Sequence, residues 1–487
     1  MAESEPLWLA IDQGTQSTRA ALINERRQLV ELGKVPVSLN RVSNLMVEQD
    51  GAELIDSVWK AINKVVSSDN KDKIRGAGLA TQRSSVIAWN RQTGKPLSNV
   101  ISWQDVRGHE FLESLKPETA ARIRRTSGLP LSPHYGASKI RWLVERLRSD
   151  GVALESGEIC IGPLSSFLLF NLIGAGGPCQ VDHANGGRTQ LMSFESRDWD
   201  DHSLSLFEIP RAILPETRPT QFDFGILSGT NIPFRVCQGD QTAAVFGGGK
   251  LSPGTAHINL GTGGFVLAPI DDLKRIRQYQ EMPLLISLAS SNQQHADYIL
   301  EGTINGAGSA INWAAQQLKL DSVEQNLDSW AQQVSEPPLF FNSVGGIGSP
   351  IWNSSPPDEF ANRWFDLDLK PISEPQADLA MVGVLESVVF LVTLNLETMR
   401  DLEIKISTLR LTGGMAKSKE LCQRLADLSG CEIICPSESE STLLGIARLL
   451  GKNTDVDEQS GQKFVPKTNP TLEQRYRAFK NLITRSN

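Results

Sequence analysis

Asp12 precedes a short polar segment, Gly14-Thr15-Gln16-Ser17, which lies between two apolar runs at 7–11 and 20–23. The runs predict two strands joined by a tight hairpin. Gly14 lets backbone amides approach a ligand closely, and successive amides in a turn form a concavity that binds anions. Because a carboxylate at position 12 would repel a bare phosphate, its presence favours a Mg²⁺ ion carried by a nucleotide. The residues predict a phosphate-binding hairpin, although a plain hairpin would use the same types.

A similar turn, Gly261-Thr262-Gly263, lies in the second half of the chain between apolar runs at 255–260 and 265–268. Either turn alone is weak support for a ligand site, because Gly-rich turns join many strands. Their recurrence roughly half a chain apart favours two facing lobes that share one phosphate ligand. The first turn is not followed by Gly-Lys-Ser/Thr, so it is not a P-loop.

Asp240 is the strongest candidate for an acid-base residue. It follows a strand-like run at 234–238 and precedes a helical run at 242–246. A carboxylate at the start of a helix can serve as a cap, and the residues alone leave that alternative open. If it faces phosphate hairpins, it could accept a hydroxyl proton as a γ-phosphoryl group arrives, which is what a kinase needs.

A third glycine site, Gly413-Gly414-Met415, follows a strand-like run at 408–411. Ser418 could cap the helix that comes next, whose Leu residues fall on one face. Glycine at this joint would let a flat ring or a phosphate lie against the backbone at a helix N-terminus. A strand-to-helix turn that needs glycine for a positive φ explains the residues equally well.

Composition limits the class of partner. The chain has 487 residues, of which 40% are hydrophobic and 21% charged, and a formal net charge of −8. We expect a globular protein of several domains, with no nucleic-acid partner, because no Lys/Arg-rich run offsets the negative charge. No uninterrupted apolar stretch approaches about 20 residues and the N-terminus is acidic, so we expect no membrane partner and no export signal.

The cysteines predict a reducing compartment. Six of them are scattered, mostly in apolar runs, without the paired spacing of a zinc site: Cys160, Cys179, Cys237, Cys422, Cys431 and Cys435. We expect reduced core thiols in a cytoplasmic protein.

Strand and helix patterns alternate along the chain, which is the α/β signature. Helical spacing occurs at 52–62 and 135–147, and a short buried strand is expected at 74–79. The Gly-rich segment 247–254 is the best domain boundary, as a hinge or as a plain helix cap and turn. We therefore expect domains at 6–248 and 254–452, followed by a polar, peripheral C-terminal tail at 453–487.

Taken together, these segments resemble the FGGY carbohydrate kinase family, a branch of the actin, hexokinase and Hsp70 ATPase superfamily. The resemblance runs from about residue 7 to 450 and rests on many segments in the family's order. The similar segments are 12–19 and 261–263 (phosphate motifs), 239–241 (catalytic), 301–313 (nucleotide border), 412–418 (adenosine loop), 441–447 (the following helix), and 139–143 and 385–390 (the two family signatures).

The resemblance implies two ribonuclease H-like domains, of the actin/hexokinase/Hsp70 ATPase type, that face an interlobe cleft. It implies ATP and Mg²⁺ as cofactors, with the metal held with help from Asp12 and with Asp240 as the general base. The implied nucleotide-binding residues are Gly14, Thr15, Gln16, Ser17, Arg19, Gly261, Thr262, Gly308, Gly413, Gly414, Met415 and Ser418.

Pocket positions look closest to the glycerol kinase branch, which implies a small sugar or polyol as substrate. The implied contacts are Gln82, Arg83, Trp103, Tyr135, Asp240 and Gln241. Arg83 can donate a fork of hydrogen bonds to neighbouring hydroxyls, and Trp103 offers an apolar face to the carbon skeleton. Without the resemblance, Trp103 would be assigned to the core and Arg83 to a surface pair.

Ser84 departs from the branch, in which Glu usually follows the Arg. Loss of a carboxylate that accepts hydrogen bonds from hydroxyls leaves the acceptor open between a glycerol-like polyol and a pentulose. The expected activity is transfer of the γ-phosphoryl group of MgATP to a hydroxyl of such a molecule. Two alternatives remain: an Hsp70- or actin-like ATPase switch, and a catalytically silent sugar or nucleotide sensor on the kinase scaffold. The oligomeric state is open, with a homodimer as one option.

Overall fold

The computed structural model describes residues 5–277, 282–334, 336–436, 440–451 and 461–486. The chain forms two compact units. The first comprises residues 1–250, 286–298 and 440–458, and the second comprises 251–285, 299–439 and 459–487. Segment 440–451, which we expected in the C-terminal domain, belongs to the first unit because its helix packs on elements of that unit.

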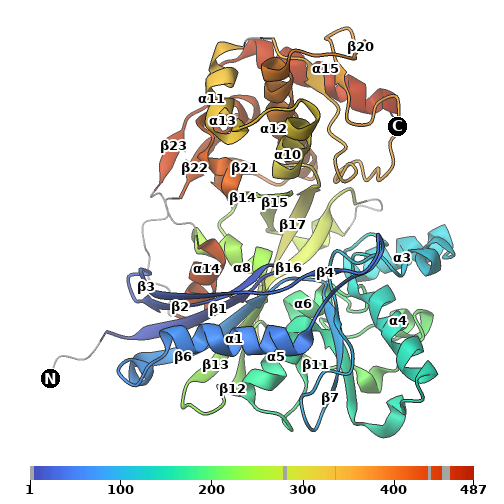
Figure 1. The fold of residues 1–487 in the computed structure, drawn as a ribbon, viewed down its shortest axis with the longest axis vertical. Coiled ribbons are helices and arrows are strands. Elements are labelled where there is room, and N and C mark those ends of the chain that lie inside the picture. The colour runs from blue at the N-terminus through green and yellow to red at the C-terminus, as the bar shows by residue number, and fades with distance from the viewer. Residues whose placement is uncertain (1–4, 278–281, 335, 437–439, 452–460, 487) are drawn as a thin grey trace. The chain divides into compact units, whose positions relative to one another are not determined.

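A six-stranded sheet forms the centre of the first unit, in the order β12-β13-β6-β1-β2-β3 (Figure 1). β1 and β2 pair antiparallel and are joined by a tight turn, which confirms the predicted first hairpin. β6 lies parallel to both β1 and β13 and includes the strand predicted at 74–79. The bounds are β1 Leu7–Gln13, β2 Ser17–Asn24, β3 Leu29–Pro36, β6 Ile74–Thr81, β12 Gln221–Ile226 and β13 Pro233–Gly239.

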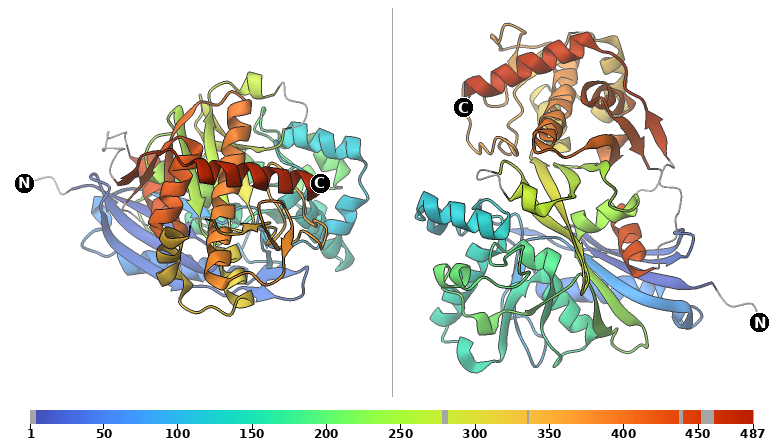
Figure 2. Two further views of the ribbon diagram at one scale, coloured as in Figure 1. Left: turned by 90° about the horizontal axis from the view of Figure 1, so that it is seen from above. Right: turned by 180° about the vertical axis from the view of Figure 1, so that it is seen from behind.

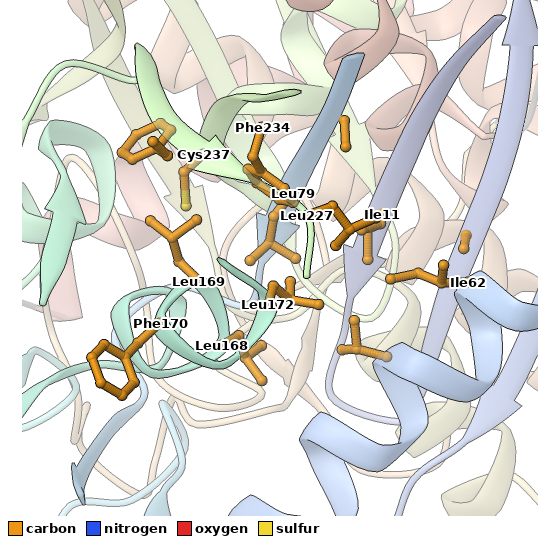
Figure 3. Packing of buried hydrophobic residues seen from close by; sticks show 14 of the residues in the cluster. Ile11, Ile62, Leu79, Leu168, Leu169, Phe170, Leu172, Leu227, Phe234 and Cys237 are labelled. Carbon is orange, nitrogen blue, oxygen red and sulfur yellow. The ribbon is translucent and has the colours of Figure 1, made fainter. Parts of the chain in front are cut away.

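The alternation of side chains along these strands decides which helix covers each face. Leu9 and Ile11 of β1 face a core shared with α1 (Gly51–Val65) and α5 (Leu164–Ile173). Figure 3 shows Ile11, Leu79 and Phe234 of three neighbouring strands in this core, beside Ile62 of α1 and Leu168, Leu169, Phe170 and Leu172 of α5. Ala10 points to the opposite face, where it meets α14 (Ser441–Leu450). Both faces of the sheet are therefore covered.

The helix α8 (Asp240–Gly247) lies against α14 with little space between their backbones. A Cβ added to Gly445 would overlap the carbonyl oxygen of Ala243, and one added to Gly247 would overlap that of Ser441. Glycine at 247 and 445 is therefore a packing requirement, because it lets the two helices approach at backbone distance.

The first unit also contains a five-stranded sheet, in the order β4-β5-β8-β7-β9. The helix α4 (Gly136–Ser149) packs its apolar face, which includes Ile140, Leu143, Val144 and Leu147, into the core beside β7 and β9, as its spacing predicted. The sheet strands are β4 Asn40–Arg41, β5 Val47–Gln49, β7 Val86–Asn90, β8 Val100–Ile101 and β9 Ile159–Pro163. The other elements are α2 His109–Glu113, α3 Pro117–Ser127, β10 Gln180–Asp182, α6 His183–Gly187, α7 Asp201–Leu206 and β11 Glu216–Arg218.

The strands of the second unit belong to a sheet in the order β16-β17-β15-β14-β21-β22-β23, of which residues 286–298, in β16 and the start of β17, are assigned to the first unit. β14 and β15 form the predicted second hairpin, and β21 lies parallel to β14. The strands are β14 Gly254–Leu260, β15 Gly264–Ile270, β16 Leu285–Ser291, β17 Ala296–Ile304, β21 Ile406–Thr412, β22 Glu432–Cys435 and β23 Gln462–Phe464. The helices are α9 Leu273–Ile276, α10 Gly308–Gln317, α11 Val323–Gln333, α12 Ala377–Asp401, α13 Lys419–Ser429 and α15 Pro470–Ser486, and a small sheet holds β18 Leu339–Phe340, β19 Trp364–Phe365 and β20 Pro371–Ile372.

By length and composition alone, α12 could cross a membrane. However, 89% of its most apolar 18-residue window is buried inside the protein. It packs beside α10, α11, α13 and β18. The apolar sequence of α12 is therefore accounted for by its place in the core of the second unit.

The expectation of a peripheral C-terminal tail was wrong for its last part. Helix α15 occupies 470–486 and buries an apolar stripe that includes Phe479. Figure 2 shows α15 crossing α12, and the rings of Phe479 and Phe390 lie 5.2 Å apart between centroids. Arg475 of α15 donates to Glu386 of α12 at 2.7 and 2.8 Å. The segment is rich in charged residues, so its composition suggested a peripheral tail, although its apolar residues recur at helical spacing. Residues 453–460 of the expected tail lie outside the described residues.

Candidate active site

Three parallel strands of the first unit end side by side. Gln13 of β1 lies opposite Thr81 of β6, and Thr81 lies opposite Gly239 of β13. The residues that follow these strands therefore share one edge of the sheet: the Gly14 turn, Gln82-Arg83 and Asp240. In open α/β sheets, this carboxyl edge is where ligands bind.

Asp12 lies at this edge with a buried side chain. Its Oδ2 accepts a hydrogen bond from Arg19, whose other Nη donates to Glu440 at 2.6 Å. Its Oδ1 is also buried and has no hydrogen-bond partner among the described residues. Burial raises the pKa of Asp12 to about 6, against the opposing effect of the Arg19 charge. An unsatisfied carboxylate oxygen of this kind fits a hard cation such as Mg²⁺.

The described residues contain no group of three or more His, Cys, Asp and Glu side chains that could hold a metal ion. A cation at Asp12 would therefore take most of its ligands from outside these side chains. Mg²⁺ is often held by one or two carboxylates together with phosphate oxygens and waters.

The turn after Asp12 is closed by the Gly14 amide, which donates to the Ser17 carbonyl at 3.0 Å. The Thr15 hydroxyl accepts from the indole Nε1 of Trp103 at 3.0 Å. The Arg19 side chain is directed to Asp12 and Glu440. Of the nucleotide residues expected in the first unit, Thr15 thus lies beside a predicted substrate contact, whereas Arg19 is paired with the predicted metal ligand.

Asp240 is the first residue of α8, and the N-cap position is occupied by Gly239. Its Oδ1 accepts from the backbone amide of Gln241 at 2.7 Å, and its side chain remains 24% exposed. Burial raises the pKa of Asp240, and the nearby charge of Arg83 opposes the shift. A partly exposed carboxylate with a raised pKa is suited to accept a proton from a bound hydroxyl.

Arg83 is buried rather than paired on the surface. Its Nε lies 3.8 Å from Oδ1 of Asp240, and its side chain is 6% exposed. A Cβ added to Gly239 would lie 2.8 Å from the Cδ and Cγ of Arg83. Because Gly239 has no side chain, the Arg83 side chain can pass beside it and place its guanidinium next to Asp240.

Gln82 is engaged by the protein itself. Its Nε2 donates to Gln49 at 2.8 Å and to Gln13 at 3.1 Å, and its Oε1 accepts from the Ser85 hydroxyl at 3.0 Å. These bonds connect the ends of β1 and β6 with β5. Gln82 thus holds these strand ends together, and its contact with the substrate stays a prediction.

Trp103 and Tyr135 differ in exposure. Trp103 is 41% exposed, which contradicts the core assignment that its residue type alone favoured. Tyr135 is 6% exposed and immediately precedes α4, and the guanidinium carbon of Arg188 lies 5.1 Å from its ring centroid. Sequence reasoning missed Arg188, which lines a small cavity of the first unit together with Arg83, Thr242, Met192 and Phe194.

The glycine sites of the second unit meet at one sheet edge. β14 and β21 are parallel neighbours with Asn259 opposite Thr412, so the turns after them lie together. The Gly308 amide donates to the Gly261 carbonyl at 2.9 Å, which places the N-terminus of α10 on this turn. A Cβ added to Gly413, whose φ is 93°, would overlap the Leu260 carbonyl oxygen. The structure thus brings Gly261, Gly308 and Gly413 together as a backbone cradle.

Ser418 is the N-cap of α13, as predicted: its Oγ accepts from the Leu421 amide at 3.1 Å. The same hydroxyl donates to Asp328, which also accepts from the Lys419 amide at 2.9 Å. Met415 lies in a short 3-10 turn, and a Cβ on the adjacent Gly414 would meet no atom within 4 Å. The backbone at Gly414 is therefore open to a ligand, whereas the Ser418 hydroxyl is occupied by the protein.

Two family models cover most of the chain: FGGY family of carbohydrate kinases, N-terminal domain, over residues 7–247, and C-terminal domain, over 256–453. The chain is 34% identical to a glycerol kinase of Geobacter sp. (strain M21) over 92% of this chain and 90% of that protein. It is 31% identical to a glycerol kinase of Halorhodospira halophila, over 93% and 89%.

Solved structures confirm the predicted fold class. Plasmodium falciparum glycerol kinase with ADP matches with a TM-score of 0.87 at 24% identity, covering 99% of this chain and 98% of that one. A ligand-bound xylulose kinase from Lactobacillus acidophilus matches with a TM-score of 0.81 at 20% identity, covering 98% and 97%. By both family models and by its curated relatives, this chain belongs to the FGGY family of carbohydrate kinases.

Proposed function

We propose that this kinase transfers the γ-phosphoryl group of ATP to a hydroxyl of a glycerol-like polyol or a pentulose, with Asp240 as the general base. The observation that carries the proposal is the position of Asp240, at the carboxyl edge shared with Asp12 and the Gly14 turn. The partly exposed carboxylate lies beside Arg83 and takes the proton from the acceptor hydroxyl.

Asp12 is the residue that would hold Mg²⁺, through its buried and unsatisfied Oδ1. When bound with the nucleotide, Mg²⁺ neutralises the charge of the phosphate oxygens. Arg19 holds the other carboxylate oxygen, so the orientation of Asp12 is fixed by the protein before any ligand arrives. Glu440 in turn fixes Arg19.

Phosphoryl transfer leaves little covalent work for the protein, so positioning and charge stabilisation supply most of the rate. Arg83 and Trp103 hold the acceptor, with Tyr135 beside them. Each unit contributes a hairpin turn as its proposed phosphate contact: Gly14-Thr15 in the first unit and Gly261-Thr262 in the second. The base adds a smaller factor, because proton transfer to Asp240 is late.

The cradle of the second unit would hold the rest of the nucleotide. Gly414 leaves backbone open to a flat ring, and Gly413 lets its turn pack against Leu260. The first amides of α10, at Gly308 and Ser309, bond to the Gly261-Thr262 turn and so hold that turn in place. Met415 supplies an apolar contact. For Ser418 we propose a supporting role, because its hydroxyl is engaged by Asp328 and by the Leu421 amide.

The residue type at position 84 bears on whether the acceptor is a glycerol-like polyol or a pentulose. Serine offers one short hydroxyl where the glycerol kinase branch has a carboxylate, so hydroxyl groups of the acceptor lose a charged hydrogen-bond partner. The curated relatives are named glycerol kinases, whereas xylulose kinases share the fold. Both classes are therefore retained for testing.

ADP release with MgATP across glycerol, tetritols, pentitols, ketopentoses and ketohexoses tests the proposal. We expect at least one acceptor to raise ADP release, and Asp240→Ala to abolish the increase. Asp223→Ala is the matched control, because Asp223 is a 62% exposed carboxylate paired with Arg235 on the surface. ATP hydrolysis that no acceptor changes would favour the ATPase switch, and nucleotide or sugar binding without turnover would favour the sensor.

We also propose a cytoplasmic location. All six cysteines are buried and free in the structure, including Cys422 and Cys435, whose sulfur atoms lie 3.6 Å apart. Thiols that remain unpaired at such a separation suit a reducing compartment.

A further inference from the structure

Lys139 is a fully buried lysine in the first turn of α4. Its Nζ donates to the backbone carbonyls of Ser102 and His134 at 2.8 Å each, and to that of Ser84 at 3.2 Å. All three recorded partners of the ammonium are backbone oxygens. They come from three loops that are far apart in the sequence.

Each of these carbonyls is adjacent in the chain to a residue assigned to the acceptor pocket. Ser84 follows Arg83, Ser102 precedes Trp103, and His134 precedes Tyr135. An ammonium group has three N–H donors, which matches the three acceptors one to one. A displacement of any of the three loops would therefore leave a buried donor and a buried acceptor unsatisfied.

We propose that Lys139 is a positioning residue that sets the separation of Arg83, Trp103 and Tyr135 and thereby determines the affinity for the acceptor. The inference rests on the proposed function, because it takes those three side chains as the acceptor pocket. It assigns to Lys139 no contact with the substrate or with the phosphates.

The pKa of Lys139 is set by its burial and by two charged neighbours, Asp105 and Arg107. Asp105 favours its charge, but this carboxylate is already bound by Arg107 at 2.7 and 2.9 Å and by the Val47 amide at 2.7 Å. Arg107, which also donates to Glu48 at 2.6 Å, opposes the charge of Lys139. Burial is the largest effect and lowers the pKa of Lys139 to about 7.

Loss of the proton would remove one of the three donors. A neutral amine has two N–H groups, so one of the three carbonyls would lose its partner above the pKa. The ring of His134 also faces this region, and desolvation lowers the pKa of that imidazole, so His134 is neutral in the same range. The arginines remain charged throughout. The acceptor pocket should therefore loosen as pH rises past about 7.

The first test compares Lys139→Met with Lys64→Met. Lys64 also donates to a backbone carbonyl, that of Lys34 at 2.7 Å, but it is exposed and lies at the end of α1. We expect Lys139→Met to raise the KM for glycerol or xylulose about tenfold or more, with the KM for ATP within about twofold of wild type. Lys64→Met should change neither. A Lys139→Met enzyme that folds and keeps the wild-type KM for both acceptors would overturn the proposal.

The second test uses the wild-type protein and does not depend on whether the variant folds. We expect kcat/KM for the acceptor to fall about threefold to tenfold between pH 7 and pH 9, while kcat/KM for ATP at saturating acceptor stays level. A profile for the acceptor that stays flat over this range would contradict the inference.

Calorimetric titration with glycerol and xylulose separates this inference from the proposed function. If the wild-type protein binds an acceptor without turning it over, and Lys139→Met binds it at least tenfold more weakly, the positioning role stands while the kinase proposal fails. Turnover by the wild type with equal acceptor affinity in both proteins refutes the positioning role alone. Failure of the wild type to bind any acceptor, when the titration is extended to the tetritols, pentitols and ketopentoses of the activity panel, refutes both.

Discussion

Arg83 and Asp240 form a partly buried pair, with Nε of the arginine 3.8 Å from Oδ1 of the aspartate. The distance exceeds that of a direct hydrogen bond, so the guanidinium lowers the pKa of the carboxyl without occupying it. The glycine at 239 makes this arrangement possible, because a side chain there would meet the arginine. This pair therefore combines the proposed base with a positive charge that opposes the rise in its pKa caused by burial.

Replacement of Asp240 by Asn tests the base directly. The amide keeps the shape of the side chain but cannot accept the proton, so we expect kcat to fall by about 10²–10⁴-fold. The KM for ATP should stay within about twofold, because no phosphate contact is assigned to this residue. Near-normal turnover in Asp240→Asn, measured as ADP release, would refute the role.

Replacement of Arg83 by Met should change the pH profile as well as acceptor affinity. The arginine charge lowers the pKa of Asp240 against the effect of burial, so its removal raises that pKa. A base acts when deprotonated, so the acidic limb of kcat/KM for the acceptor should move to higher pH. An acidic limb that does not move, with folding verified by circular dichroism, would show that the two residues are not coupled.

The Mg²⁺ requirement should increase in acid. Burial raises the pKa of Asp12 to about 6, and only the ionised carboxylate can bind the metal. Protons therefore compete with Mg²⁺ as the pH falls through about 6, and the Mg²⁺ concentration for half-maximal ADP release should be higher at pH 5.5 than at pH 7.5. Asp12→Asn should show a high requirement at both values. A wild-type requirement that is equal at the two pH values argues against Asp12 as a ligand.

The close packing of α8 on α14 predicts that Gly445→Ala destabilises the first unit. The added methyl would overlap the Ala243 carbonyl oxygen, so the helices must separate. We expect a loss of about 1–3 kcal/mol in the free energy of unfolding, measured by urea denaturation. Gly177→Ala is the control, because its Cβ would meet only the Gly174 carbonyl oxygen at 3.6 Å. Equal stability of the two variants would mean that the helix contact adapts without cost.

Local patterns were enough to predict much of the framework. The apolar runs on either side of Gly14-Thr15 and Gly261-Thr262 predicted both hairpins, and the strand before Asp240 predicted its place at the start of a helix. These elements depend on residues close together in the sequence. The roles of the individual site residues stay predictions, since they concern ligands.

Contacts between distant segments could not be read from the sequence. The resemblance placed Gln82 in the substrate pocket, but its bonds to Gln13 and Gln49, which come from other strands, could not be predicted. The place of Arg188 beside the Tyr135 ring depends on how two loops meet. That the C-terminal helix packs on α12 could not be predicted, because the ion pair of Arg475 with Glu386 joins residues 89 positions apart.

The return of α14 to the first unit has a consequence for biosynthesis. The face of the central sheet that carries Ala10, Ala80 and Val236 is covered by Leu443, Leu444 and Ile446 of this helix. A nascent chain that has left the ribosome only as far as residue 250 would leave that apolar face bare. The helix that begins at Asp240 would also lack its neighbour, so Asp240 reaches its packed position only after residues 441–450 have been synthesised.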